Sequence, residues 1–252
     1  MRHDVSRRTF LVDASRAMLA LCGASLLGVD TALGVLGHPH VDAWLSRVQH
    51  LSTGVKQGAI TSRAWRRRLQ RATRRVPLAD VLRATRFDSV AKSAELFEGD
   101  EPQEHLALAP SPGLEGFAFS AIVSHIRQGF AVVPHGHHNM VSMHLVLQGS
   151  VHLRQYDRLH DEPMHLVLRP TIDRLCSPGD TSAISADRGN VHWFRGLTDS
   201  FALIIAAYDL DPTVEAAGRD YVDPLAGEPQ PGGSIRVPRI TEEEARRRYL
   251  NL

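Results

Sequence analysis

The strongest constraint on the fold is a succession of short β-prone segments between residues 117 and 205, with no helical pattern among them. Each holds four to seven residues rich in Val, Ile, Leu and Phe, and turn formers such as Gly149 and residues 177–180 separate them. Short strands that follow one another without crossover helices pair in antiparallel sheets, so the sequence predicts a sandwich or barrel, specifically an antiparallel jelly roll. The segments are 117–123, 130–133, 143–147, 151–156, 164–168 and 201–205.

Helical patterns flank the β-prone region. Between residues 38 and 93 apolar residues recur at helical spacing in two runs, which predicts two or three helices whose apolar stripes dock on a larger core. The recurring residues are Trp44, Val48 and Leu51 in the first run and Trp65, Leu69 and Val76 in the second. Residues 211–233 are rich in Pro and Gly and predict coil, and a capping box at 241–244 predicts a short terminal helix through Leu250.

The N-terminus has the layout of an export signal, with a charged start, an apolar middle and small residues near residue 34. Residues 6–11, Ser-Arg-Arg-Thr-Phe-Leu, resemble the twin-arginine motif of bacterial Tat signals, which implies the Tat export machinery as a partner and a periplasmic or secreted protein. The alternative is an ordinary amphipathic helix with a chance arginine pair. The apolar run 17–29 is too short to span a membrane, so no stable span is expected after cleavage.

These patterns divide the chain into four parts. The expected boundaries are 1–34 for the signal, 35–104 for a helical extension and linker, 105–212 for the barrel, and 213–252 for a wrapping tail with a terminal helix.

Charge is distributed unevenly along the chain. Residues 1–99 carry 16 Lys and Arg against eight Asp and Glu, although the whole chain has a formal net charge of only +1. Seven of the thirteen residues from Arg63 to Arg75 are arginine, a pattern that can attract an anionic surface or nucleic acid. We favour the solvated face of an amphipathic helix, in a protein exported away from nucleic acid.

Histidine is the unusual residue type, with fourteen in the chain and ten between His105 and His192. His135 and His137 are two residues apart in an extended segment, so both imidazoles project from one face and can reach one ion. His192 belongs to a later strand that follows a tight turn. With only Cys22 and Cys176, the chain has no disulfide framework and no cysteine-rich zinc site, so a metal site depends on these histidines.

This spacing resembles that of the cupin superfamily, whose first motif is Gly-x5-His-x-His-x3–4-Glu-x6-Gly and whose second includes Pro-x-Gly-x2-His-x3-Asn. The matching residues are Gly129, His135, His137 and Gly149 in the first motif and Gly189 and His192 in the second. The resemblance implies a mainly β, cupin-type jelly-roll barrel with an N-terminal helical extension and a short C-terminal helix. It also implies that His135, His137 and His192 are metal ligands.

The chain departs from the cupin pattern at three positions. Ser142 stands where the motif has glutamate, Asp187 replaces a proline, and Gly196 replaces an asparagine. A site of three neutral imidazoles leaves the dication charge uncompensated, which favours an anionic substrate group such as a thiolate or carboxylate. Among cupins, the three-histidine pattern is similar to that of the thiol dioxygenases, which act on cysteine, cysteamine or N-terminal cysteine.

Several further residues are candidates around the site. Ser142 and His144 share a strand face, so His144 is a candidate second-shell donor or alternative ligand, and His138 would replace His137 if the strand register slipped. Tyr156 is a further second-shell candidate. The chain also offers Tyr208 as a phenol and Arg154 and Arg188 as carboxylate clamps, although barrel-surface positions are the more common role for such residues.

The motifs and the departures from them lead to two alternative hypotheses about function. The first is an exported metal-dependent cupin, specifically a non-haem iron dioxygenase that binds Fe(II) and acts on a small thiol or another anionic small molecule; Mn, Ni, Cu or Zn fit the same ligands. The alternative is a non-catalytic cupin that binds a ligand or has a structural role. Pairing through barrel edges would make a homodimer, and no nucleic-acid partner is expected.

Overall fold

The computed structural model describes residues 39–95, 103–106, 117–214 and 218–251. The expected export signal at 1–34 lies outside this part of the chain, and the twin-arginine motif stays a prediction. Among the described residues, no helix combines the length and apolar character that crossing a membrane requires.

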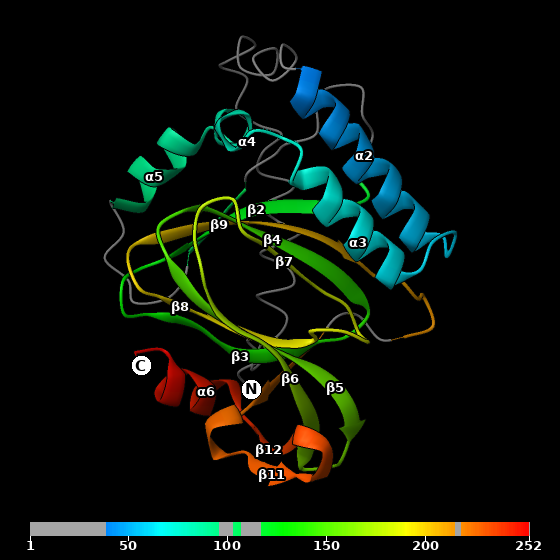
Figure 1. Ribbon diagram of the computed structural model, residues 1–252, viewed down its shortest axis with the longest axis vertical. Coiled ribbons are helices and arrows are strands. Elements are labelled where there is room, and N and C mark those ends of the chain that lie inside the picture. The colour runs from blue at the N-terminus through cyan, green and yellow to red at the C-terminus, as the bar shows by residue number, and fades with distance from the viewer. Residues whose placement is uncertain (1–38, 96–102, 107–116, 215–217, 252) are drawn as a thin grey trace, which may run out of the picture. The chain divides into compact units, whose positions relative to one another are not determined.

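Two antiparallel sheets form the body of the structure (Figure 1). The first sheet has the order β1-β2-β9-β4-β7, and the second has the order β10-β3-β8-β5-β6-β12-β11. The first comprises β1 (Gln103–Leu106), β2 (Ser120–Ile126), β9 (Ser200–Tyr208), β4 (Met140–Gln148) and β7 (Thr181–Ile184). The second comprises β10 (Arg219–Val222), β3 (Ala131–His137), β8 (Val191–Gly196), β5 (Val151–Asp161), β6 (His165–Cys176), β12 (Ser234–Ile240) and β11 (Glu228–Gln230).

The strand β4 explains how the first sheet is buried on both faces. Alternate side chains of a strand point to opposite faces, and Val141, Met143 and Leu145 belong to an apolar core shared with the helices. Ser142 and His144 therefore point the other way, into the barrel, where both line an internal cavity. One strand thus supplies helix-packing residues and cavity residues in strict alternation.

In the described residues 39–95 there are four helices, where the sequence predicts two or three. They are α2 (Pro39–Lys56), α3 (Ser62–Thr73), α4 (Leu78–Ala84) and α5 (Phe87–Glu95). The additional boundaries have local causes: Pro77 occupies the N-cap of α4, and Arg86 takes a φ of 51° between α4 and α5. The helices pack on the first sheet through the predicted apolar stripes, and the Trp65 Nε1–H donates to Ser52 Oγ at 3.2 Å.

The C-terminal tail differs from its prediction. Residues predicted as coil include β10 and β11, and with β12 they join the second sheet. The physical reason is long-range pairing: β10 pairs with β3 and β12, and β11 pairs with β12, which itself covers the edge of β6. The capping box at Thr241 and Glu244 is confirmed and starts α6 (Glu242–Tyr249).

The predicted architecture is confirmed in the described part of the chain: it is mainly β, with two antiparallel sheets, helices that precede them and a short C-terminal helix. Cys176 is a buried free thiol, and burial raises its pKa.

The two glycines of the first motif, Gly129 and Gly149, provide a matched stability test. Gly129 and Gly149 have φ of 84° and 81°, but an added Cβ at Gly129 meets no atom within 4 Å, whereas at Gly149 it collides with the Asp199 carbonyl oxygen. We expect Gly129→Ala to cost about 1–2 kcal/mol of unfolding free energy from backbone strain alone. Gly149→Ala should cause a further loss of about 1–3 kcal/mol of unfolding free energy, because the added methyl group overpacks against Asp199. Urea denaturation of both variants measures this difference, and equal losses would contradict the close approach at Gly149.

Candidate metal centre

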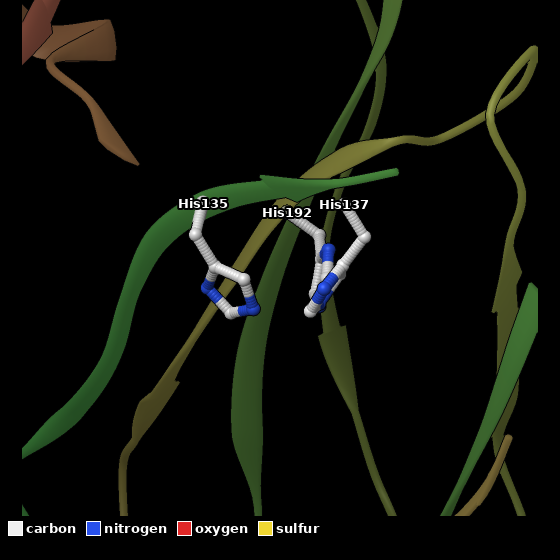
Figure 2. A group of neighbouring side chains, drawn as sticks. All are labelled: His135, His137 and His192. Carbon is white, nitrogen blue, oxygen red and sulfur yellow. The ribbon is translucent and has the colours of Figure 1, made fainter. Parts of the chain in front are cut away.

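Three histidines project from adjacent strands of the second sheet. His135 and His137 lie on β3, and alternation places both rings on its inner face. His192 lies on β8 as the direct cross-strand partner of His135. Figure 2 shows the three rings on the same side of the sheet. The predicted trio is therefore brought together by strand pairing.

The distances between the rings suit a shared ion. One ligand nitrogen from each of His135, His137 and His192 can be chosen so that all three lie within 4.8 Å of one another. The His135 ring centroid is 4.6 Å from that of His137 and 4.5 Å from that of His192. Histidine nitrogens bind zinc at about 2.0–2.1 Å, so three nitrogens this close together form a candidate site for one ion.

Backbone hydrogen bonds orient two of the imidazoles. His135 Nδ1–H donates to the Val133 carbonyl oxygen at 2.7 Å, and His192 Nδ1–H donates to the Asn190 carbonyl oxygen at 3.2 Å. Each bond fixes the tautomer that leaves an Nε2 lone pair for a ligand, the second-shell arrangement typical of metal-binding histidine. The donor set therefore fits a divalent metal.

The electrostatics keep these histidines neutral. Burial, followed by the neighbouring rings and Arg219, lowers the pKa of His135 well below its ordinary value, and burial does the same for His137. Burial also lowers the pKa of His192 to about 4. Because a metal binds only the unprotonated nitrogen, these imidazoles are ready for coordination at neutral pH.

Gly136 and Asn190 hold the two strands in this register. Asn190 Nδ2 donates to the His137 carbonyl oxygen at 2.7 Å. An added Cβ at Gly136 would lie 2.6 Å from Asn190 Oδ1, so only glycine allows this approach. Gly136, which lies between His135 and His137, must therefore be small because a side chain there would collide with Asn190.

The strand β10 contributes a basic residue that sequence reasoning missed. Arg219 is the direct cross-strand partner of His137, and Tyr221 is that of His135. Both line the cavity that contains the histidines, and Arg219 is exposed, so it lies where the cavity meets solvent. Nothing near these residues in the sequence reveals their position, because it depends on pairing with a strand about eighty residues earlier.

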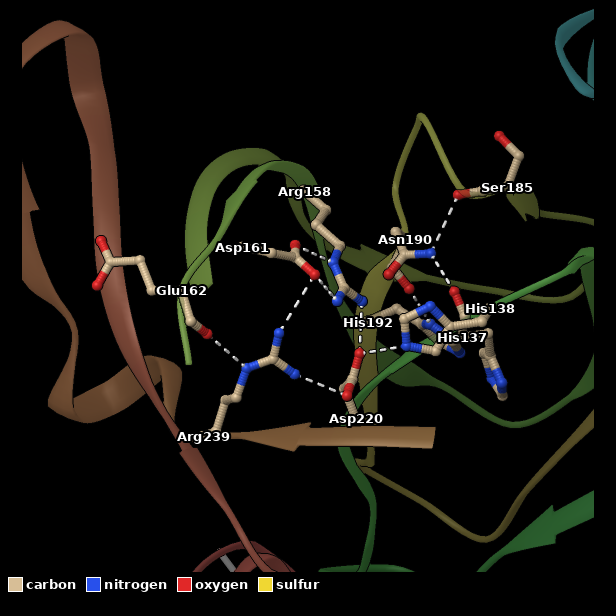
Figure 3. A network of polar contacts seen from close by, with 10 residues as sticks. All are labelled: His137, His138, Arg158, Asp161, Glu162, Ser185, Asn190, His192, Asp220 and Arg239. Atoms are coloured by element: carbon tan, nitrogen blue, oxygen red, sulfur yellow. Dashed lines mark hydrogen bonds and ion pairs between the residues drawn. The ribbon is translucent and has the colours of Figure 1, made fainter. Parts of the chain in front are cut away.

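A polar network fixes β10 beside β3 (Figure 3). Asp220 lies between Arg219 and Tyr221 and points to the opposite face, where it contacts His138 Nε2 at 2.5 Å and Arg158 Nη1 at 2.6 Å. Arg239 Nη1 donates to the other oxygen of Asp220 at 2.7 Å. His138 is thus turned away from the trio, which removes the register-slip alternative.

The facing sheet supplies the opposite wall of the cavity. His144 is buried, its ring centroid lies 5.2 Å from that of His192, and burial lowers its pKa well below the ordinary value. Its Nδ1 contacts Ser182 Oγ at 3.1 Å and its Nε2 contacts Ser142 Oγ at 3.4 Å. His144 does not belong to the close group formed by the other three histidines among the described residues. Its place and that of Ser142 are compatible with second-shell roles, which stay predictions.

The remaining candidates lie elsewhere, apart from Tyr208, which lines the cavity. Tyr156 packs in an apolar cluster with Trp193 outside the cavity lining. Arg154 forms an ion pair with Asp173 and lies over the Trp193 ring. Arg188 pairs with Asp157 at 3.3 Å. The two predicted carboxylate clamps are therefore engaged away from the histidines.

The cavity is small and mostly apolar around the trio. Its volume is about 170 Å³. Aliphatic and aromatic side chains from both sheets surround the histidines, among them Ile122, Ile126, Phe194 and Ile204. A cavity of about 150 Å³ is large enough to hold benzene, so this one accommodates a molecule of similar size.

Comparisons with known proteins give the chain no family assignment. No protein-family model matches it, and no curated protein matches it. Solved structures that resemble it include procruciferin, an 11S globulin from Brassica napus (17% identity, TM-score 0.31, covering 42% of this chain and 23% of that one). An 11S globulin from Wrightia tinctoria, whose structure reveals an auxin binding site, has 15% identity and a TM-score of 0.31, covering 41% and 22%. CapF, solved with the inhibitor 3-isopropenyl-tropolone, has 18% identity and a TM-score of 0.30, covering 39% and 27%. The matched part spans about a quarter of each of these proteins.

Proposed function

We propose that the protein is a metal-dependent cupin that oxidises a small anionic substrate, most specifically a non-haem iron dioxygenase acting on a small thiol. The observation that carries the proposal is the convergence of His135, His137 and His192 in one cavity with Arg219 beside them. Three neutral ligands without a carboxylate leave the metal's full charge available for an anionic group of the substrate.

The residues of the chain have distinct roles in this proposal. His135, His137 and His192 would hold the metal, and Fe(II) bound there would supply open coordination positions and redox chemistry, while the electrons that reduce dioxygen would come from the thiol sulfur. Arg219 binds and orients a second anionic group, such as a carboxylate, because its guanidinium offers paired donors to two oxygens. The apolar walls exclude water from the reacting atoms.

The size of the cavity limits the substrate. A volume of about 170 Å³ admits a molecule with few heavy atoms, such as a free amino thiol, and excludes a folded polypeptide. We propose further that the protein is exported by the Tat machinery to the periplasm or beyond the cell and forms a homodimer through its barrel edges.

The test measures oxygen consumption and sulfinate formation by the protein loaded anaerobically with Fe(II) and supplied with cysteine or cysteamine. We expect oxygen uptake with a small thiol, in which sulfur gains both oxygen atoms. Arg219→Gln should raise KM for cysteine by about tenfold to a hundredfold, the effect of losing a charged hydrogen bond, and leave KM for cysteamine nearly unchanged, because cysteamine has no carboxylate.

Arg219→Lys serves as the matched control, since it keeps the charge and loses the paired donors. Equal KM changes for the two thiols would contradict the assigned role of Arg219. A protein that binds stoichiometric iron but consumes no oxygen with any small thiol would favour the alternative, a cupin that binds a ligand without catalysis.

A further inference from the structure

A second hollow lies on the opposite side of the first sheet from the histidine cavity, between α3 and the turn that follows β7. Its volume is about 600 Å³. It is lined by Arg63, Arg66, Arg67, Gln70, Arg71, Arg74, Arg75, Asp187 and Arg188. Seven guanidinium groups and one carboxylate thus surround a single concave space.

The helix α3 arranges most of these arginines by its register. Arg63, Arg67, Arg71 and Arg74 follow one another at intervals of three or four residues, so they form one stripe along the helix. The opposite stripe, which includes Trp65, is buried against the first sheet. Docking of the apolar stripe leaves the basic stripe exposed, as the solvated-face interpretation expects, and the same four arginines also line the hollow.

Contacts from the sheet side complete the hollow. Arg66 Nε donates to the Ala183 carbonyl oxygen on β7 at 3.1 Å, which fixes its guanidinium against the barrel. Arg188 belongs to the turn after β7 and pairs with Asp157 at 3.3 Å. Asp187 accepts a hydrogen bond from Ser185 Oγ at 2.6 Å. The one carboxylate of the lining thus already has a partner.

Most of the positive charge in the hollow is not neutralised within the described part of the chain. Arg63, Arg67, Arg71, Arg74 and Arg75 form no ion pair there with any described carboxylate, and α3 itself contains no acidic residue. Like charges three or four residues apart destabilise a helix. A bound anion would relieve this repulsion, so the arrangement favours occupancy.

We propose that this hollow binds a compact ligand that carries several adjacent phosphate groups. Guanidinium groups match phosphate oxygens with paired donors, and the stripe from Arg63 to Arg74 extends for about 16 Å at 1.5 Å per residue. That length exceeds one phosphate and suits a linear oligophosphate, whether free or attached to a larger molecule.

The lining distinguishes this ligand from other polyanions. The described residues of the lining include no aromatic side chain, and single-stranded nucleic acids are bound through base stacking on aromatic residues. The space is concave and is walled by both α3 and a turn of the barrel, whereas a membrane surface requires a flat or protruding basic face. A compact oligophosphate fits a concave space lined by arginines without aromatic side chains.

In the experiment, inorganic tripolyphosphate is titrated into the full-length chain by calorimetry at 0.15 M salt. Orthophosphate and a nucleoside triphosphate serve as comparison ligands. We expect saturable binding of tripolyphosphate, a higher Tm in its presence, and much weaker binding of orthophosphate. Comparing the affinities for tripolyphosphate and for the nucleoside triphosphate shows whether the hollow binds a free oligophosphate or one attached to a larger molecule.

Neighbouring arginines of one helix provide the matched variants. Arg67→Ala and Arg71→Ala should each weaken tripolyphosphate binding by about tenfold, because each removes a charge-assisted hydrogen bond. Arg68→Ala, a neighbour on α3 outside the lining, should change it by less than about twofold. Arg71→Lys should also weaken binding, since lysine keeps the charge and loses the paired donors.

Three results would overturn the proposal. The first is no saturable binding of tripolyphosphate, and the second is equal weakening by Arg67→Ala and Arg68→Ala. The third is tighter binding of a single-stranded oligonucleotide, or of vesicles containing anionic lipid, that the same variants abolish. Circular dichroism checks that each variant is folded. Arg67 and Arg71 are exposed, so their substitution does not disturb the apolar core, and weaker binding reports on the hollow itself.

Discussion

His192→Ala is expected to abolish stoichiometric metal binding while the barrel stays folded. The substitution removes the only one of the three imidazoles that comes from β8, and two histidines on one strand cannot enclose an ion alone. Because loss of a supporting hydrogen bond already costs 10–100-fold in metal affinity, loss of a ligand should cost on the order of a hundredfold or more. Calorimetric titration with Zn²⁺ and metal analysis of the purified protein measure the change.

Two histidine variants serve as controls for this prediction. His152→Ala changes a histidine that contacts Asp173 on the outside of β5, so metal affinity should be unaffected. His138→Ala changes the residue next to His137 that contacts Asp220, and it should keep metal occupancy near that of the parent protein. Full occupancy in His192→Ala would show that the ligand assignment is wrong, and loss of metal in His138→Ala alone would restore the register-slip alternative.

Trp65→Ala is expected to produce the largest loss of stability. The side chain is fully buried between α3 and the first sheet, and its Nε1–H donates to Ser52 Oγ, so truncation leaves a large cavity and an unpaired hydroxyl. Substitutions of this kind cost about 3–5 kcal/mol, a large part of the 5–15 kcal/mol that stabilises a typical domain. Urea denaturation, followed by fluorescence and circular dichroism, measures the change in unfolding free energy.

The neighbouring substitution Arg68→Ala provides the control. Arg68 is exposed on the same helix, and its truncation should change the unfolding free energy by less than about 0.5 kcal/mol. A loss below about 1 kcal/mol for Trp65→Ala would contradict the packing of α3 on the sheet. That result would also remove the basis for the arginine-lined hollow, which depends on the same docking.

Local periodicity in the sequence predicts the strands and the shared face of His135 and His137, whereas His192 is predicted only through the resemblance to the second cupin motif. Alternation along a strand is enough to place His135 and His137 on one face and Ser142 and His144 on another. The tail could not be predicted in the same way. Pro and Gly residues at 211–233 favour coil locally, whereas pairing with β3 and β12 makes β10 a strand.

The contrast between local pattern and long-range pairing also explains which residues of the histidine cavity and of the arginine-lined hollow could be predicted from the sequence. The sequence offers Arg154 and Arg188 as carboxylate clamps, yet each has a carboxylate partner away from the trio. Arg219 carries no motif and lies beside His137 only because β10 pairs with β3. The stripe of arginines on α3 is visible in the sequence, but the hollow also requires the turn after β7, more than a hundred residues later.

What the sequence determined by itself is therefore each residue's face within its own strand or helix, since the repeats of 2.0 and 3.6 residues are properties of the local backbone. Only the tertiary structure decided which faces meet: His192 with His135, Arg219 with His137, and the stripe of α3 with Arg188. These encounters follow from strand register and from burial of the shared apolar core, which depend on contacts between residues far apart in the chain.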